Sequence, residues 1–187
     1  MITCNRIVLV ILPLFLYSQA EPKILEHLTQ QMKILPEISN AIAYRIACNT
    51  LLRVYDETSE AIGRRDFSRL GELHGLACVL KVCCSYDSTF GVERLRQSCG
   101  GHGYLAAANL GNLFAETAAG CTYEGENSVL LLQVGKMLMK VWSDVLASKQ
   151  LMPTFSYLAE LAQWEQFPQW DGSWNCLVKA FKYASLG

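Results

Sequence analysis

Apolar residues recur every three or four positions over long stretches of this chain, and this period restricts those stretches to helices. The first stretch runs from about residue 23 to residue 62 and stops near Gly63. Its apolar residues are Leu25, Leu28, Met32, Leu35, Ile38, Ile42 and Ile46. Such a stripe is typical of a helix that lays one face on a core, so we expect it to be buried. Pro36 lies inside the stretch and predicts a kink, or a break into two helices.

Two further stretches carry the same period. The second covers about residues 67–98 and ends at Gly100 and Gly101, and its stripe consists of Leu70, Leu73, Ala77, Leu80, Cys84, Gly91 and Leu95. The third, from Glu124 to about Ala147, is apolar on more than one face, so we expect this helix to lie centrally in the fold. The glycine- and alanine-rich residues between them predict a loop with one short helix near 112–117.

Three long helices predict an all-α fold, arranged as an up-and-down bundle. The 187 residues suffice for one domain of ordinary size. We expect the bundle over residues 21–147, and a linker with the start of a second helical segment over residues 148–187, where a helix begins at Trp174. Three helices leave an apolar face open, and 51% of the residues are hydrophobic. That face therefore needs a fourth helix, a second subunit or a missing piece of the protein.

Residues 1–20 form an apolar leader that is similar to a signal peptide. Ile7–Tyr17 carries no charge and is too short to span a bilayer, which needs about 20 residues. Arg6 precedes this run, and the small residues Ser18 and Ala20 stand where a cleavage site requires them. A secretory protein is therefore one alternative. A short buried helix or strand is the other interpretation of the same residues.

Composition and charge argue against several classes of function. The net charge is −1 and the 16 basic residues are scattered, which disfavours a nucleic-acid binder. The eight cysteines include no CxxC pair, and we interpret them as reduced thiols, some of them small buried hydrophobes. Because His27, His74 and His102 lie far apart, we expect no metal site.

Glu124 is the best candidate for chemistry. It lies in a tight Tyr-Glu-Gly step directly before the apolar third helix. A carboxylate acts as a general base where its surroundings limit its solvation, and the neighbouring apolar run offers such surroundings. The alternative is that Glu124 and Glu126 are both first-turn acids, favoured by the positive end of the helix dipole.

A glycine turn upstream is the second candidate. Cys99-Gly-Gly-His-Gly-Tyr104 has three glycines within four positions, and glycine lets the backbone approach a ligand closely. Its spacing fits neither the dinucleotide-binding motif nor the phosphate-binding loop. Taken alone, the turn is equally well explained as the glycine cap that ends the second helix.

Together the two segments resemble the acyl-CoA oxidases. The matching text comprises LRQSCGGHGY, AGCTYEGENSVLLLQ and KMLMK, and the similarity extends over about residues 21–185. The resemblance implies the fold of that family's C-terminal helical domain, with Glu124 as the base that removes the α-proton of a fatty acyl-CoA. It also implies that Gly100, Gly101, His102 and Gly103 help to hold FAD across a homodimer.

The implied reaction is oxidation of a fatty acyl-CoA to the trans-2-enoyl-CoA in the peroxisome, with O2 reduced to hydrogen peroxide. Several features depart from the family pattern. The family's N-terminal helical domain and β-domain have no match in these 187 residues, and Leu28 stands where members commonly carry a glutamine near the neighbouring subunit's flavin. The last residues, Ser185-Leu-Gly187, are not the Ser-Lys-Leu peroxisomal signal. We therefore expect a truncated member of the family; the alternative is a catalytically silent helical dimerisation module derived from it.

Overall fold

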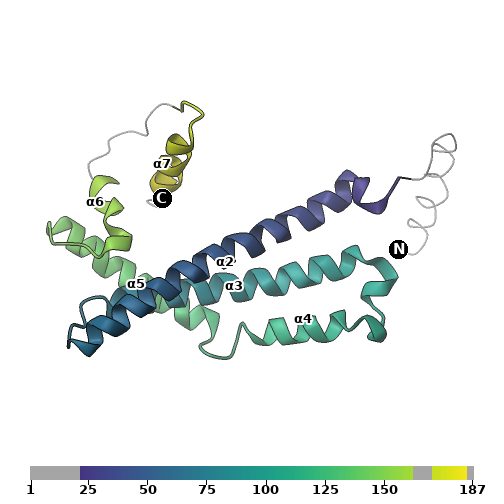
Figure 1. Cartoon of the computed structure of the whole chain (residues 1–187), viewed down its shortest axis with the longest axis horizontal. Coiled ribbons are helices and arrows are strands. Elements are labelled where there is room, and N and C mark those ends of the chain that lie inside the picture. The colour runs from purple at the N-terminus through teal and green to yellow at the C-terminus, as the bar shows by residue number, and fades with distance from the viewer. Residues whose placement is uncertain (1–21, 162–169, 185–187) are drawn as a thin grey trace.

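Helices make up all the regular secondary structure in the described part of the chain (Figure 1). The structure is a computed structural model that describes residues 22–161 and 170–184. The α-helices are α2 (Leu28–Gly63), α3 (Leu70–Ser98), α4 (Leu110–Ala119), α5 (Asn127–Leu146), α6 (Tyr157–Leu161) and α7 (Trp174–Ala184). Short 3-10 helices are η1 (Ile24–Glu26), η2 (Gly100–Gly103), η3 (Ala106–Ala108) and η4 (Pro153–Phe155). The all-α prediction is confirmed. No helix within the described ranges is long and apolar enough to cross a membrane.

Helices α2 and α3 lie side by side and run antiparallel, and polar contacts fix their register (Figure 1). Near the start of α2, the side-chain amide of Gln30 donates to the backbone carbonyl of Ser98 at 3.2 Å. Further along, the hydroxyl of Tyr44 donates to the carboxylate of Asp87. The face of α2 that packs on α3 is therefore partly polar.

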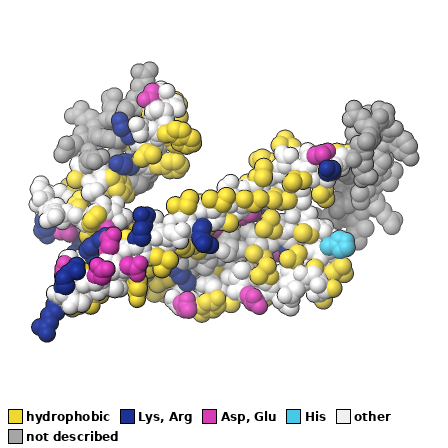
Figure 2. All heavy atoms as spheres, in the orientation of Figure 1, with side chains coloured by type: hydrophobic (Ala, Val, Ile, Leu, Met, Phe, Trp, Pro, Cys, Tyr) yellow, Lys and Arg dark blue, Asp and Glu magenta, His cyan; other side chains and the backbone are white. Residues whose placement is uncertain are grey.

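The apolar stripe of α2 faces solvent, so the prediction that it packs on the core is wrong. Its seven residues, Leu25 in η1 and Leu28 to Ile46 in α2, are between 50% and 70% exposed. Figure 2 shows hydrophobic side chains following α2 along the surface. The opposite face carries further apolar residues, among them Leu51, Val54 and the buried Ala61. Apolar residues on two faces are typical of a helix between two layers, and the described chain supplies only one of those layers.

Pro36 lies inside α2 without dividing it, so the predicted alternative of two separate helices is wrong. Proline removes the hydrogen bond to the carbonyl four residues earlier, which here belongs to Met32. Met32 is on the exposed face, where water can satisfy that carbonyl. The helix then ends at Gly63, where the sequence predicts a stop.

Helix α3, rather than α5, is the central helix, because it packs against α2, α4 and α5. Cys78 and Val82 of α3 form a core cluster with Leu130 and Val134 of α5. The prediction that the third long helix lies centrally is wrong, since α5 buries only one of its apolar faces. On the other face, Leu132 remains 68% exposed.

The remaining bounds differ from the predictions by a few residues. Helix α4 spans Leu110–Ala119 and is longer than the predicted 112–117. Helix α5 begins at Asn127, three residues after Glu124, which therefore stands outside the helix. Helix α7 begins at Trp174, as predicted. The apolar leader, residues 1–20, lies outside the described residues.

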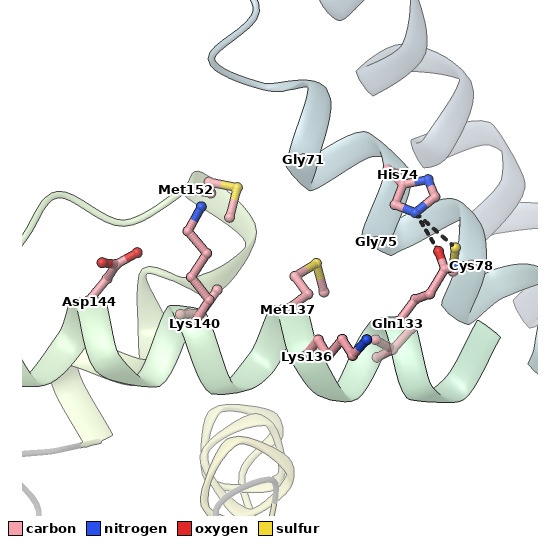
Figure 3. Close-up of a pocket in the computed structure, with 12 residues that line it drawn as sticks. Gly71, His74, Gly75, Cys78, Gln133, Lys136, Met137, Lys140, Asp144 and Met152 are labelled. Carbon is pink, nitrogen blue, oxygen red and sulfur yellow. Dashed lines mark hydrogen bonds between the residues drawn. The ribbon is translucent and has the colours of Figure 1, made fainter. Parts of the chain in front are cut away.

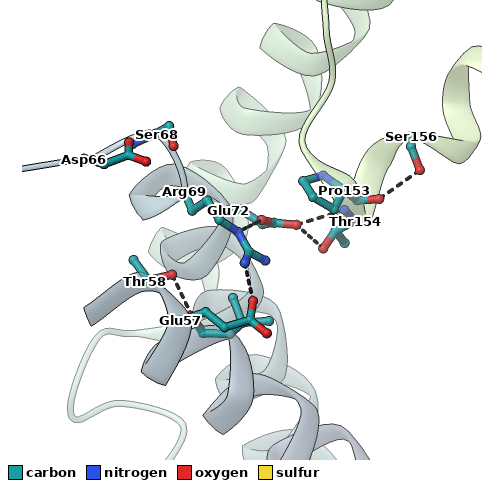
Figure 4. A network of polar contacts seen from close by, with 10 residues as sticks. Glu57, Thr58, Asp66, Ser68, Arg69, Glu72, Pro153, Thr154 and Ser156 are labelled. Carbon is teal, nitrogen blue, oxygen red and sulfur yellow. Dashed lines mark hydrogen bonds and ion pairs between the residues drawn. The ribbon is translucent and has the colours of Figure 1, made fainter. Parts of the chain in front are cut away.

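A buried carboxylate ties the chain after α5 back to α3 (Figure 4). Glu72 of α3 is fully buried, and it accepts a hydrogen bond from the backbone N–H of Thr154 at 2.9 Å and another from the Thr154 hydroxyl. Arg69 donates to the other oxygen of Glu72 at 3.1 Å and also pairs with Glu57 of α2. Burial by itself raises the pKa of Glu72, but the hydrogen bonds from Thr154 and Arg69 outweigh it and hold the pKa below its ordinary value.

Candidate active site

The turn between α4 and α5 carries Glu124 in a rare backbone conformation. Glu124 has φ +55° and the next residue, Gly125, has φ +103°. Left-handed conformations are sparsely populated by residues other than glycine, and they persist where surrounding contacts hold them. Glu124 is exposed, and its carboxylate has no hydrogen bond or ion pair within the described ranges. The turn thus presents an unpaired carboxylate to the solvent.

Glu126, two residues later, has a different role. It is the N-cap of α5, and its carboxylate accepts from the backbone N–H of Val129 at 3.1 Å and from the hydroxyl of Ser128 at 3.1 Å. Hydrogen bonds from Ser128 and Val129 hold the pKa of Glu126 below its ordinary value. The interpretation as a helix-end acid therefore holds for Glu126 and not for Glu124, which caps no helix among the described residues.

Three polar residues spaced one turn apart on α3, Lys81, Ser85 and Thr89, hold the segment that carries Glu124. The hydroxyl of Thr89 donates to the carbonyl of Thr117 at 3.0 Å, at the end of α4. The side chain of Asn127 donates to the hydroxyl of Ser85 at 2.9 Å. Lys81 donates to the carbonyl of Gly125 at 2.5 Å and to the side-chain oxygen of Asn127 at 2.8 Å. Sequence reasoning missed these residues, although their spacing of four marks a polar stripe on a helix.

The glycine turn forms η2, directly after α3. Gly100 has φ +59°, while Gly101 and His102 are exposed. Gly103 is buried against α3, and a Cβ at this position would lie 1.9 Å from the carbonyl oxygen of Arg96. Only glycine fits there, because a backbone atom cannot move aside as a flexible side chain can. At Gly100 and Gly101 an added Cβ would meet no atom within 4 Å, so the turn leaves open space on its outer side.

The structure does not bring the two predicted parts of the site together within one chain. The glycine turn and Glu124 lie beyond opposite ends of α4 (Figure 1). This helix has 10 residues, which correspond to about 15 Å at 1.5 Å per residue. A ligand on the outer side of the glycine turn is therefore not in direct contact with Glu124 of the same chain, unless it extends along α4.

A separate cavity of about 320 Å³ lies between α3, α5 and the segment around Met152 (Figure 3). Cys78, Met137 and Val141 give it apolar walls, and His74 hydrogen-bonds Gln133 across the two helices at 2.9 Å. The sequence offered no signal for this cavity, since its lining residues come from distant segments. In the described ranges, no disulfide joins two cysteines and no cluster of three His, Cys, Asp or Glu residues could hold a metal ion.

Comparisons with known proteins decide the family. The chain matches the model for the acyl-CoA oxidase C-alpha1 domain over residues 15–139, more than half of its length. The chain belongs to the acyl-CoA oxidase family. Acyl-coenzyme A oxidase 1 of Drosophila melanogaster is 41% identical over 168 residues, which cover 90% of this chain and 25% of that protein. Human peroxisomal acyl-coenzyme A oxidase 1 is 36% identical over 161 residues, which cover 86% of this chain and 24% of that protein.

Solved structures of acyl-CoA oxidases share the fold. The tomato (Lycopersicon esculentum) enzyme superposes with a TM-score of 0.83 at 32% identity, over 88% of this chain and 26% of that one. Acyl-CoA oxidase-1 of Caenorhabditis elegans, complexed with FAD and ATP, gives a TM-score of 0.79 at 30% identity, over 89% of this chain and 26% of that one. The helical bundle is therefore that of an acyl-CoA oxidase, and the chain spans about a quarter of the length of these relatives.

The match to the family begins at residue 15, inside the apolar leader. A secretory location finds no support among the relatives, of which the human protein and its mouse counterpart are named peroxisomal.

Proposed function

We propose that this chain provides the catalytic base of an acyl-CoA oxidase, which converts a fatty acyl-CoA to the trans-2-enoyl-CoA and reduces O2 to hydrogen peroxide. The observation that carries the proposal is the backbone of Glu124. This residue lies within the part of the chain that matches the family model, stands in a left-handed turn that costs free energy, and has no partner among the described residues. Non-glycine residues in such conformations cluster at functional sites, and Glu126 already supplies the helix cap.

In this mechanism the carboxylate of Glu124 removes the α-proton of the acyl group. The thioester oxygen gains negative charge as the proton leaves, and it needs hydrogen-bond donors that are already in place. The backbone N–H of Glu124 suits this role, because it makes no hydrogen bond within the described ranges. Base and donor would then belong to one residue, and the turn that orients the carboxylate would orient the N–H as well.

FAD is the cofactor that the family implies, and the glycine turn fits a contact with it. The open space outside Gly100 and Gly101 and the exposed side chain of His102 leave the backbone of this turn accessible to a large planar or phosphorylated group. Gly103 holds the turn against α3 from the inner side. FAD held there would supply the acceptor for the β-hydride and the route of the electrons to O2.

The separation of the two parts of the site favours a homodimer. Because α4 lies between Glu124 and the glycine turn, we infer that the turn of one subunit contacts the cofactor that serves the glutamate of the other. The exposed apolar stripe of α2 supplies surface for such an association. We infer a peroxisomal location, as in the relatives that carry this word in their names.

A chimera tests the proposal. Residues 22–184 of this chain replace the matching segment of the Drosophila acyl-coenzyme A oxidase 1, and the purified chimera is assayed for flavin absorbance and for peroxide formation with palmitoyl-CoA. We expect both, and we expect neither from the 187-residue chain alone, because the chain spans only a quarter of that relative. A chimera that folds and retains FAD but forms no peroxide would contradict the proposal. Peroxide formation by the 187-residue chain alone would contradict the need for the additional domains.

A further inference from the structure

We propose that Lys81 is a positioning residue for Glu124, and that it acts by fixing the two residues that follow the glutamate turn. This inference rests on the proposed function of Glu124, but the contacts that support it are independent of that function. Lys81 is not itself placed on a substrate or cofactor.

The backbone conformation of the glutamate turn has to be held by contacts. Glu124 and Gly125 are both left-handed, at φ +55° and φ +103°. Nothing in the intrinsic preference of a glutamate favours this backbone, so the contacts around the turn must select it. On its inner side the methyl groups of Leu130 lie under Gly125, where an added Cβ would be 2.9 Å from one of them and 3.1 Å from the other. This contact limits how far the turn can move inward.

Lys81 anchors the turn on the side opposite Leu130. The ammonium group of Lys81 donates to the carbonyl oxygen of Gly125 at 2.5 Å and to the side-chain oxygen of Asn127 at 2.8 Å. The carbonyl of Gly125 belongs to the peptide that follows the second left-handed residue, so fixing its direction fixes the rotation of the turn. An ammonium group has three donors, and hydrogen bonds from a charged donor are stronger than neutral ones.

Lys81 and its partner Asn127 are both held in fixed surroundings. Asn127 is fully buried, and its backbone N–H closes the turn by donating to the carbonyl of Cys121 at 3.1 Å. Its side chain also contacts the hydroxyl of Ser85, one helical turn beyond Lys81. Lys81 itself precedes Val82, which lies in the core cluster between α3 and α5. The positioning contact therefore joins the turn to a helix that is fixed by the core.

Within the described residues, the hydrogen bonds of Lys81 are confined to this turn, and this distinguishes a positioning role from stabilisation of the whole bundle. Both of its hydrogen bonds reach residues within three positions of Glu124. Loss of the lysine should release the turn while the helices remain packed. A residue that stabilised the whole bundle would instead change the unfolding of every helix.

Hydrogen exchange in the 187-residue chain tests the contact without any assay of activity. Three variants are compared with the native chain: Lys81→Met, which removes the donors, Lys81→Arg, which keeps charge and donors, and Lys140→Met, an exposed lysine of α5 as the matched control. In Lys81→Met we expect the amide of Asn127 to exchange about tenfold faster, because its closing hydrogen bond opens more often. Amides of α3 and α5 should keep their rates, and the other two variants should resemble the native chain.

Kinetics of the chimera then test the link to Glu124. We expect Lys81→Met to lower kcat by about tenfold or more, with KM for palmitoyl-CoA changed less than threefold, because a misplaced base weakens the transition state more than the bound substrate. Lys81→Arg should restore most of kcat. Lys140→Met should leave both constants unchanged.

The outcomes are distinguishable. Equal exchange rates for Asn127 in Lys81→Met and in the native chain would overturn the inference, whatever the chimera does. Faster exchange throughout α3 and α5 would also overturn it, since Lys81 would then stabilise the bundle as a whole. Faster exchange confined to the turn, with kcat unchanged in an active chimera, would show that the lysine holds the turn but does not position the base. If the native chimera were inactive, the proposed function would fail, and the exchange result would still decide whether Lys81 holds the turn.

Discussion

The carboxylate of Glu72 accepts hydrogen bonds from both the backbone N–H and the hydroxyl of Thr154, across 82 residues of sequence. The buried carboxylate of Glu72 thus binds the first turn of η4. Pro153 in this turn has no backbone N–H to donate, so Thr154 supplies both hydrogen bonds. The contact places Phe155 and Leu158 against Val141 of α5 in a second core cluster. The helices and the chain that follows them are therefore joined by one polar anchor and one apolar cluster.

Removing the charge of Glu72 should destabilise the protein. Glu72→Gln keeps the size of the side chain but weakens its bonds to Arg69 and Thr154, so we expect a loss of about 1–3 kcal/mol in the free energy of unfolding. Urea denaturation followed by circular dichroism measures this loss. Glu116→Gln, at an exposed position of α4, serves as the control and should change stability by less than about 0.5 kcal/mol. Equal stabilities of the two variants would contradict the assigned role of Glu72.

The same carboxylate should contribute to the pH dependence of stability. The pKa of Glu72 in the folded protein lies below its ordinary value of 4.5, with Arg69 and Thr154 favouring the ionised form. A depressed folded-state pKa gives stability that is present above the unfolded-state value and is lost as the pH falls through the folded-state value. We therefore expect the native protein and Glu72→Gln to differ most above about pH 5, and the difference to shrink as the pH falls below 4.5. A difference that stays constant between pH 7 and pH 3 would be evidence against this linkage.

Two glycines of the same turn should differ in how much stability an added methyl group costs. Gly103→Ala would place a Cβ 1.9 Å from the carbonyl oxygen of Arg96, whereas Gly101→Ala would meet no atom within 4 Å. We expect the first variant to lose about 1–3 kcal/mol of stability and the second to lose little, as measured by thermal unfolding. If Gly101→Ala were the more damaging of the two, the packing of η2 against α3 would differ from the one described.

The exposed stripe of α2 should cause self-association. Leu28, Met32 and Ile46 are each more than 60% exposed, and soluble monomers seldom leave such a continuous apolar surface uncovered. Light scattering on protein that begins at Glu21 should detect dimers or larger species at micromolar concentration. Ile42→Lys places a charge within the stripe and should shift the protein toward the monomer, while Lys140→Met on α5 should not. A monodisperse native monomer would instead favour a self-sufficient helical module.

The sequence was sufficient to predict the helices, but it could not decide which of their faces are buried. The period of three to four residues located α2, α3 and α5 because it follows from the geometry of the helix itself. The stripe from Leu25 to Ile46 was predicted to lie on the core and proved to be exposed. A surface that awaits a partner has the same composition as a core, so the pattern alone does not separate them. The central position of α3 could not be predicted for the same reason.

The residues of the candidate site could likewise be predicted only in part from the sequence. The Tyr-Glu-Gly step and the family resemblance pointed to Glu124, but the local sequence left open that it is a helix-end acid like Glu126. The backbone angles and hydrogen bonds show that Glu126 caps α5 and Glu124 does not. Lys81 was not predicted, because its role depends on two partners more than forty positions away. Its place in a polar stripe with Ser85 was visible in the sequence, yet such a stripe more often faces solvent.

A comparison of Glu124→Gln with Glu126→Gln in the chimera tests the central claim most directly. Both substitutions remove one carboxylate from the same turn, and only the first removes the proposed base. We predict that Glu124→Gln lowers peroxide formation from palmitoyl-CoA by a factor of about 10³ or more with FAD still bound. Glu126→Gln, which loses part of a helix cap, should lower stability modestly and keep turnover within about tenfold of the native chimera. Normal turnover in Glu124→Gln, or a larger loss in Glu126→Gln, would contradict the assignment of Glu124 as the base.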